Sequence, residues 1–316
     1  MKYNHILIYM IIKKEKKDGI TVYTVQKDLT DEEMELRMNR YVDKKDINTI
    51  IRDHDCDVFT EEGKLLMRFR TNVLTKKNNK QFYDNIIKFA HNTSSNRGST
   101  SGAETKKKHV GTNPHVMSNI FGYFDKWSPS QKFVFKKLGK KPLVDVRETR
   151  FNMESPEKYK KTIPLLREIN KLYKKLAPEY YKKQYKKAKE TFFRIDNTAF
   201  TTVTTNINFR TTVHTDKGDD VEGFGNLVTF ETGSYSGAET CFPQYGIGID
   251  VREQDFLLMD VHQPHGNLPI VLNTPDTERM SIVCYLRKAV WEKTRNKTKK
   301  FFEKHRRTMK KMRRID

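Results

Sequence analysis

Two histidines and an aspartate in the C-terminal half of the chain have the spacing of metal ligands. His214 and Asp216 are two apart in FRTTVHTDKGDD, so on an extended segment both side chains leave the same face. His262 and His265 follow in DVHQPHGN, far enough along for the chain to cross a small domain and return. Two histidines and one carboxylate, with open positions opposite them, form the facial triad of non-haem Fe(II) oxygenases. We favour His265 as the second histidine; the alternative role for His262 is support of a ligand by hydrogen bonding.

A cosubstrate site is predicted in the segment ERMSIVCYLR. Arg279 and Ser281 are two apart there, so they share a face of the expected strand. A guanidinium pairs bidentately with a carboxylate, so Arg279 is the expected anchor for the distal carboxylate of 2-oxoglutarate, and Ser281 can add a hydrogen bond. Each motif alone is common, and a zinc hydrolase could use the same triad. The ordered set, all within 68 residues, indicates an oxygenase that needs Fe(II), 2-oxoglutarate and O2.

The residues around these motifs predict a β-rich core. Short runs of period two are separated by turns that contain Gly, Asp or Pro, as in a β-sandwich or jelly roll. These runs are 199–206, 209–215, 227–231, 247–251, 256–260 and 280–286. We expect an α+β fold whose core is a double-stranded β-helix, with supporting helices and a basic C-terminal helix.

Helical spacing is clearest between residues 155 and 190. Apolar residues recur on one face at Leu165, Ile169, Leu172 and Leu176. Pro178 interrupts the pattern, so the sequence predicts two helices there, with lysines on their outer faces.

The N-terminal residues predict a smaller α/β unit. Strands are expected over 6–12 and 20–25, followed by a helix from Asp31 to about Tyr41 that is capped by Thr30. A further strand is expected over 64–74. Residues 92–113 are rich in Asn, Ser, Thr, Gly and Lys and predict a loop.

The charge favours a polyanionic partner. The formal net charge is +21, which points to nucleic acid first and acidic membrane surfaces second, while a lysine-rich solubilising surface is the plain alternative. The last thirty residues hold fourteen Lys or Arg and three acids, with no Gly or Pro, which predicts a basic helix that neutralises phosphates.

Cysteine and hydropathy patterns favour an intracellular protein without membrane association. Three scattered cysteines are too few for a disulfide framework and lack zinc-ligand spacing. The apolar run over 6–12 is far shorter than the roughly 20 residues of a membrane span.

The motifs resemble those of the TET/JBP family of nucleic-acid dioxygenases, which includes methylcytosine oxidases, thymidine hydroxylases of base-J synthesis, and viral, phage and fungal relatives. The run AFTTVTTNINFRTTVHTDKGDDVEGFGNL is similar to the family's first-ligand strand, and LLMDVHQPHGN to its second. GSYSGAETCFPQYGIGIDV resembles the hairpin between them, and ERMSIVCYLR the closing strand. With weaker likeness upstream, the resemblance covers about 61–288. It implies an N-terminal α/β extension (1–60), a dioxygenase domain (61–288, core about 199–288) and a basic helical tail (289–316).

The resemblance implies roles for individual residues. His214, Asp216 and His265 would bind Fe(II), and Arg279 with Ser281 would bind 2-oxoglutarate. Asp219 falls at a base-contacting position that is an amide in methylcytosine oxidases. Segment 96–102 loosely resembles an Arg-Gly loop near the family's active site, so 92–113 is either a lid or a linker.

Parity with His214 along the expected strand adds three candidate pocket residues. These are Asn208, Arg210 and Thr212, and the alternative is that they are ordinary strand residues facing water.

The implied activity is hydroxylation of a pyrimidine C5-methyl group in DNA, with RNA as the alternative, on a base flipped out of its stack. Between the two bases, 5-methylcytosine is narrowly favoured over thymine, because Asp219 can accept a hydrogen bond from its exocyclic amine. The alternatives are a protein or peptide hydroxylase of the prolyl-hydroxylase type and a catalytically idle nucleic-acid-binding protein. A monomer is assumed, in the nucleus of a eukaryotic host or otherwise in the cytoplasm.

Overall fold

The computed structural model describes residues 11–94, 97–102, 116–127, 129–139 and 141–313. Most of the strand expected over 6–12 and part of the loop expected over 92–113 lie outside these residues.

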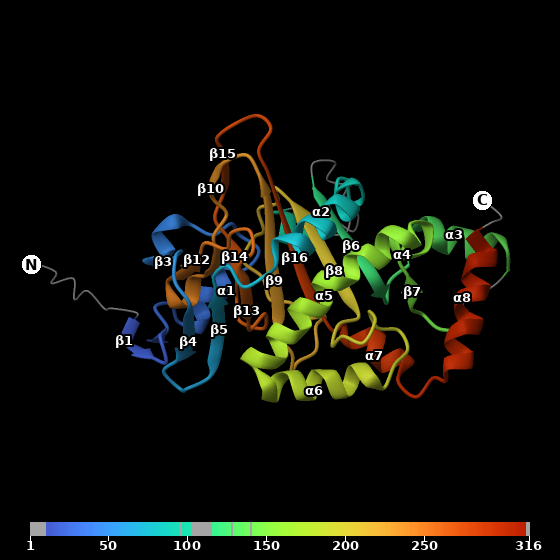
Figure 1. The fold of residues 1–316 in the computed structure, drawn as a ribbon, viewed down its shortest axis with the longest axis horizontal. Helices are drawn as coiled ribbons and strands as arrows, with labels where there is room; N and C mark the ends of the chain where they lie inside the picture. The colour runs from blue at the N-terminus through green and yellow to red at the C-terminus, as the bar shows by residue number, and fades with distance from the viewer. Residues whose placement is uncertain (1–10, 95–96, 103–115, 128, 140, 314–316) are drawn as a thin grey trace, which may run out of the picture.

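One large sheet dominates the molecule (Figure 1). Its ten strands lie in the order β1 (Ile11–Lys17), β2 (Ile20–Val25), β4 (Cys56–Thr60), β5 (Leu65–Arg70), β13 (Phe256–Met259), β9 (Gly225–Thr232), β16 (Glu278–Tyr285), β8 (Thr202–Ile207), β6 (Met117–Phe124) and β7 (Arg147–Glu148).

Two smaller sheets complete the β structure. Four strands pair in the order β14 (Gly266–Asn267), β11 (Thr240–Phe242), β12 (Ile247–Ile249) and β3 (Thr49–Ile51), and β10 (Tyr235–Gly237) pairs with β15 (Ile270–Leu272). The predicted α+β jelly roll with supporting helices is confirmed. The sequence patterns missed eight strands that are short or lack a clear period: β3, β4, β6, β7, β10, β11, β14 and β15.

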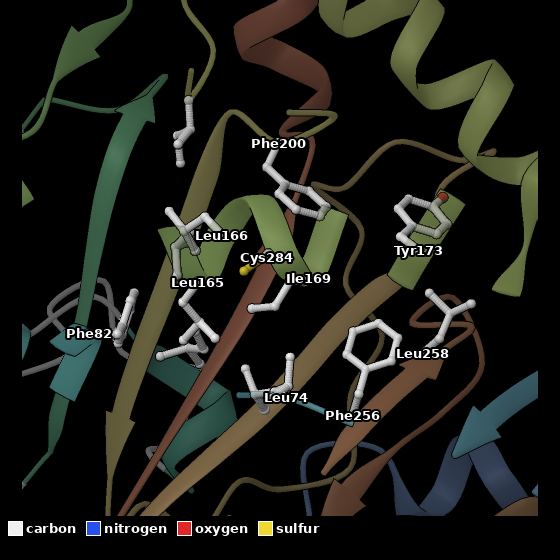
Figure 2. Close-up of a cluster of buried hydrophobic side chains, with 14 of the residues drawn as sticks. Leu74, Phe82, Leu165, Leu166, Ile169, Tyr173, Phe200, Phe256, Leu258 and Cys284 are labelled. Carbon is white, nitrogen blue, oxygen red and sulfur yellow. The ribbon is translucent and has the colours of Figure 1, made fainter. Parts of the chain in front are cut away.

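Helices cover one face of the large sheet, and the strand residues alternate accordingly. Along β16, Met280, Ile282 and Cys284 belong to the core beneath α2 (Lys76–Ala90) and α5 (Pro156–Leu176). Figure 2 shows this core, in which side chains of α5 meet Phe82 of α2 and Phe256 of β13. The alternate residues of the strands therefore face the other side, where the functional residues lie.

The two helices predicted between residues 155 and 190 are confirmed. Pro156 occupies the first turn of α5, and Leu165, Ile169 and Leu176 are buried along one face. A new helix, α6 (Pro178–Lys189), begins at the proline predicted to interrupt the pattern.

The N-terminal residues join the large sheet. Thr30 caps α1 (Asp31–Arg37) through a complete capping box with Glu33. The helix ends four residues before the expected Tyr41, because Asn39 adopts a left-handed conformation and its N–H donates to Val213 O.

The strand expected over 209–215 is not regular. It forms two isolated bridges instead: Thr212 pairs with Tyr41, and His214 pairs with His265. The segment is extended only where these two partners hold it.

The basic C-terminal residues form two helices, α7 (Lys288–Thr294) and α8 (Lys299–Arg313), where the sequence predicted one. Asn296 lies between them with a φ of +64°, which breaks the helix. In Figure 1, α8 stands beside β7 and α3 (Pro129–Lys137), at the opposite end of the molecule from β1. Among the described residues, no helix is both long and apolar enough to cross a membrane.

Candidate metal and cosubstrate site

A reciprocal backbone pair brings the two predicted histidine ligands together. His214 N donates to His265 O at 2.8 Å, and His265 N donates to His214 O at 2.9 Å. The carboxylate oxygens of Asp216 lie 3.6 Å from His214 Nε2 and 3.9 Å from His265 Nε2. One ligand atom from each residue lies within 4.8 Å of the others, a spacing that suits a single metal ion.

Hydrogen bonds fix both rings with Nε2 available to a metal. His214 Nδ1 donates to Thr212 O at 2.7 Å, and His265 Nδ1 donates to Gln263 O at 2.9 Å. Since a carbonyl only accepts, both Nδ1 atoms carry a proton, which leaves Nε2 as the atom of each ring that can bind a metal. Burial, reinforced by the neighbouring His214, lowers the pKa of His265 to about 4, so this ring is neutral at physiological pH.

His262 lies outside this group. Its Nε2 donates to Asp220 O at 3.0 Å, which makes it a support for the loop that follows Asp216. The geometry thus agrees with the choice of His265 over His262.

A cavity of about 1010 Å³ opens over the triad. The strand residues that face away from the helices line it, among them Asn206 on β8, Met259 on β13 and Val283 on β16. Arg279 and Ser281 line the same cavity, as their shared parity predicts.

Arg279 has the properties of an anion anchor. Its side chain is 7% exposed, and its Nε has no hydrogen-bond partner among the described residues. A buried guanidinium with unused donors is costly unless an anion fills the site, and a carboxylate matches its planar geometry.

Asn208 and Arg210 do not reach the cavity, contrary to the parity argument. Asn208 Oδ1 accepts from Arg279 N at 2.8 Å, so it fixes the backbone of the anchor. Arg210 donates to Val42 O at 3.0 Å and lies 4.4 Å from the centre of the Tyr41 ring. Both side chains lie elsewhere because 209–215 is not a continuous strand, so its alternate residues do not share a face.

Thr212 also has a structural role. Its Oγ1 donates to Ser99 O at 2.8 Å, and its N–H donates to Thr100 O at 3.0 Å. These bonds hold residues 97–102 against the site.

This docking places Arg97 in the cavity wall. Its Nε and Nη2 are buried without a partner among the described residues, and the burial lowers the pKa of its guanidinium. Arg97 is thus a second cation available to an anion beside the triad. Its only sequence signal was the loose likeness of segment 96–102 to an Arg-Gly loop, and the observed docking favours the functional interpretation for 97–102.

Asp219 presents a buried carboxyl to the cavity. It is 6% exposed, and its Oδ2 has no partner among the described residues. Burial and the nearby Asp216 raise its pKa well above the usual range, although Arg287 opposes this. Arg287 passes close over Gly218 and is held by Asp125 at 2.7 Å. A neutral Asp219 can both donate and accept a hydrogen bond.

The outer part of the cavity is basic and contains an aromatic residue. Lys126, Lys132 and Arg147 line it, together with Trp127, whose Nε1 donates to Asp145 at 3.3 Å. No sequence motif marked these residues, because three separate segments contribute them.

Comparisons with known proteins agree with this site. Residues 134–288 match the Tet_JBP family, described as the oxygenase domain of the 2OGFeDO superfamily. The bifunctional helicase and thymine dioxygenase JBP2 of Leishmania tarentolae is 37% identical over 141 residues, which are 45% of this chain and 13% of that protein. Thymine dioxygenase JBP1-A of Trypanosoma cruzi is 32% identical over 179 residues, which are 56% of this chain and 20% of that protein.

A solved structure, NgTET1 in complex with 5mC DNA, resembles the fold. The TM-score is 0.53 at 11% identity, over 88% of this chain and 100% of that one. The chain spans a fifth or less of the length of the curated relatives described above.

Proposed function

We propose that this chain, which through residues 134–288 belongs to the TET/JBP family of Fe(II)- and 2-oxoglutarate-dependent oxygenases, hydroxylates the C5-methyl group of thymine in DNA. One observation carries the proposal. The metal-ligand triad, the buried Arg279 and the buried Asp219 all line one cavity.

Each group has a defined task in this reaction. His214, Asp216 and His265 would hold Fe(II) by three positions and leave the others open. When bound, Fe(II), 2-oxoglutarate and O2 would together supply the oxidation: one oxygen atom of O2 would enter the hydroxymethyl group and the other would enter succinate, with release of CO2. Arg279 and Ser281 would hold the distal carboxylate of 2-oxoglutarate, and Arg97 places a second positive charge beside the triad.

The base would enter the cavity flipped out of the duplex. A neutral Asp219 can donate to thymine O4 and accept from N3–H. With the two roles exchanged, the same carboxyl would serve 5-methylcytosine, so Asp219 does not discriminate between the bases. The two relatives named above are thymine dioxygenases, and this moves our expectation from 5-methylcytosine to thymine.

DNA is the proposed partner, which fits the net charge of +21. The proposal requires a compartment that contains DNA, meaning the nucleus in a eukaryotic cell and otherwise the cytoplasm. We retain 61–288 as the proposed dioxygenase domain, with 1–60 as an extension and 289–316 as a basic tail. Asn39 and Arg40 nevertheless support the site directly, through backbone hydrogen bonds with Val213.

The test uses duplex DNA that contains thymine or 5-methylcytosine as its only methylated pyrimidine. The protein is incubated with Fe(II), ascorbate and 2-oxoglutarate, and the DNA is digested to nucleosides and weighed. We expect a gain of one oxygen on thymidine. A gain on 5-methylcytosine alone would reverse the choice of base. No gain on either base, together with peptide-stimulated succinate release, would replace the proposal with a peptide hydroxylase.

A further inference from the structure

The helix α8 has two contrasting faces. Its inner face is packed into the protein: the Phe302 ring lies 4.8 Å from that of Phe193, and His305, Met309 and Met312 are buried. The outer face is strongly basic, and Glu303 is the only acid in the helix. Its exposed cations are Lys299, Lys300, Lys304, Arg307, Lys310 and Lys311.

Residues 145–148 lie between this helix and the outer cavity. In residues 145–148, Asp145 and Arg147 line the cavity. The alternate residues turn toward α8: Val146 O accepts from His305 Nε2 at 2.8 Å, and Glu148 pairs with Arg306 at 2.5 and 3.0 Å. This segment is therefore a wall with the cavity on one side and α8 on the other.

The basic character continues across the wall. Lys126, Lys132 and Arg147 are among the cations on the cavity side. On the other side, the exposed cations of α8 recur at the three- and four-residue spacing of Lys300, Lys304, Arg307 and Lys311. Like charges at this spacing repel one another in an isolated helix, and a polyanion relieves that repulsion.

We propose that the outer face of α8 binds the phosphate backbone of the duplex whose flipped-out base enters the cavity. The identity of the duplex as substrate rests on the proposed function; the binding face rests on the position and charge of α8. A membrane surface is disfavoured, because the apolar side of α8 is already covered by the core and cannot insert among lipids.

The test compares two variants that lose the same charge. In the first, Lys300, Lys304, Arg307 and Lys311 are all changed to Gln. In the control, the exposed residues Lys171 and Lys174 of α5 and Lys182 and Lys186 of α6 are changed to Gln. The control helices cover the face of the large sheet opposite the cavity. Both variants should keep the wild-type melting temperature and bind 2-oxoglutarate normally in the presence of Mn(II).

Affinity for a short fluorescent duplex is then measured by anisotropy over a range of salt concentrations. Each phosphate contact contributes about 0.9 to the slope of log K against log salt. We expect the α8 variant to bind the duplex at least about tenfold more weakly than wild type. The slope of log K against log salt should be smaller in magnitude by about 2 to 4. The control should stay close to wild type.

An equal loss in both variants would overturn the proposal, because it would show a general charge effect. The proposal would also be overturned if the α8 variant bound the duplex as tightly as wild type does. The same holds if the variant lost affinity for anionic phospholipid vesicles but not for the duplex. The measurement involves no turnover. A chain that binds DNA through α8 but leaves thymine unoxidised would refute the proposed function and keep the role of α8.

Discussion

At the scale of single residues, spacing along the sequence was sufficient to predict the metal-ligand triad but not the residues that surround it. His214 and Asp216 are close in sequence, so one extended stretch brings both to the same place. Arg97 and Trp127 come from segments without any periodicity, and only tertiary contacts place them at the cavity. Asn208 and Arg210 were misplaced because a regular strand was assumed where two separate bridges exist.

The metal ligands give the first prediction. His214→Ala, Asp216→Ala and His265→Ala should each abolish Fe(II)-dependent succinate production, because a metal held by two remaining ligands is bound weakly. Circular dichroism should show an intact fold. His262→Ala should keep most activity, since that ring contacts Asp220 O and not the triad. Activity within about tenfold of wild type in the three ligand variants would contradict the assignment.

The cosubstrate anchor, Arg279, gives the second prediction. Arg279→Ala should raise the KM for 2-oxoglutarate by about 10- to 100-fold, the effect of losing charge-assisted hydrogen bonds of about 1.5–3 kcal/mol. Arg279→Lys should recover only part of it, because an ammonium cannot form the paired contact. Arg210→Ala is the matched control, since Arg210 lies outside the cavity against Tyr41. A KM shift in the control equal to that of Arg279→Ala would show that the effect is not local.

At the scale of elements, α5 and α6 could be predicted from the sequence, α2 and α3 were missed, and the basic tail was predicted only as a single helix. The proline and the apolar face of α5 are local signals, and they gave both helices correctly. In α8 the lysines dominate the composition, and they concealed a buried face of Phe302, His305, Met309 and Met312. A charge count cannot show that a helix is anchored.

The anchoring of α8 should depend on pH. Burial lowers the pKa of His305 from its usual 6.5, so the folded state prefers the neutral ring. The stability this provides is therefore fully present above pH 6.5 and is lost as the pH falls below it. His305→Gln can still donate to Val146 O but does not titrate. Between pH 8 and 5, the melting temperature of the wild type should fall more steeply than that of the variant; parallel curves would contradict the argument.

At the scale of the whole molecule, the three proposed parts of the chain share one structure. β2 and β4 extend the large sheet, and α8 covers Tyr123 and Phe193. The sequence could not predict these contacts, because they join residues far apart along the chain and carry no local pattern.

Removal of residues 291–316 should therefore destabilise the protein as well as weaken its binding to DNA. It uncovers Phe193 and leaves Glu148 buried without Arg306, and an unpaired buried carboxylate is strongly destabilising. We expect a clear fall in melting temperature. An unchanged melting temperature would show that the core beneath α8 is complete without it.

The pairing of residues 39–41 with the segment that carries His214 has a consequence for biosynthesis. On the ribosome, Arg40 emerges long before Val213, and His265 emerges last of the three. A nascent chain of about 250 residues holds the first histidine and the aspartate but lacks the third ligand and the backbone partner of His214. Closing such distant contacts is slow, so iron capture must await translation past His265. Chains stalled before and after His265 should differ sharply in the metal they retain.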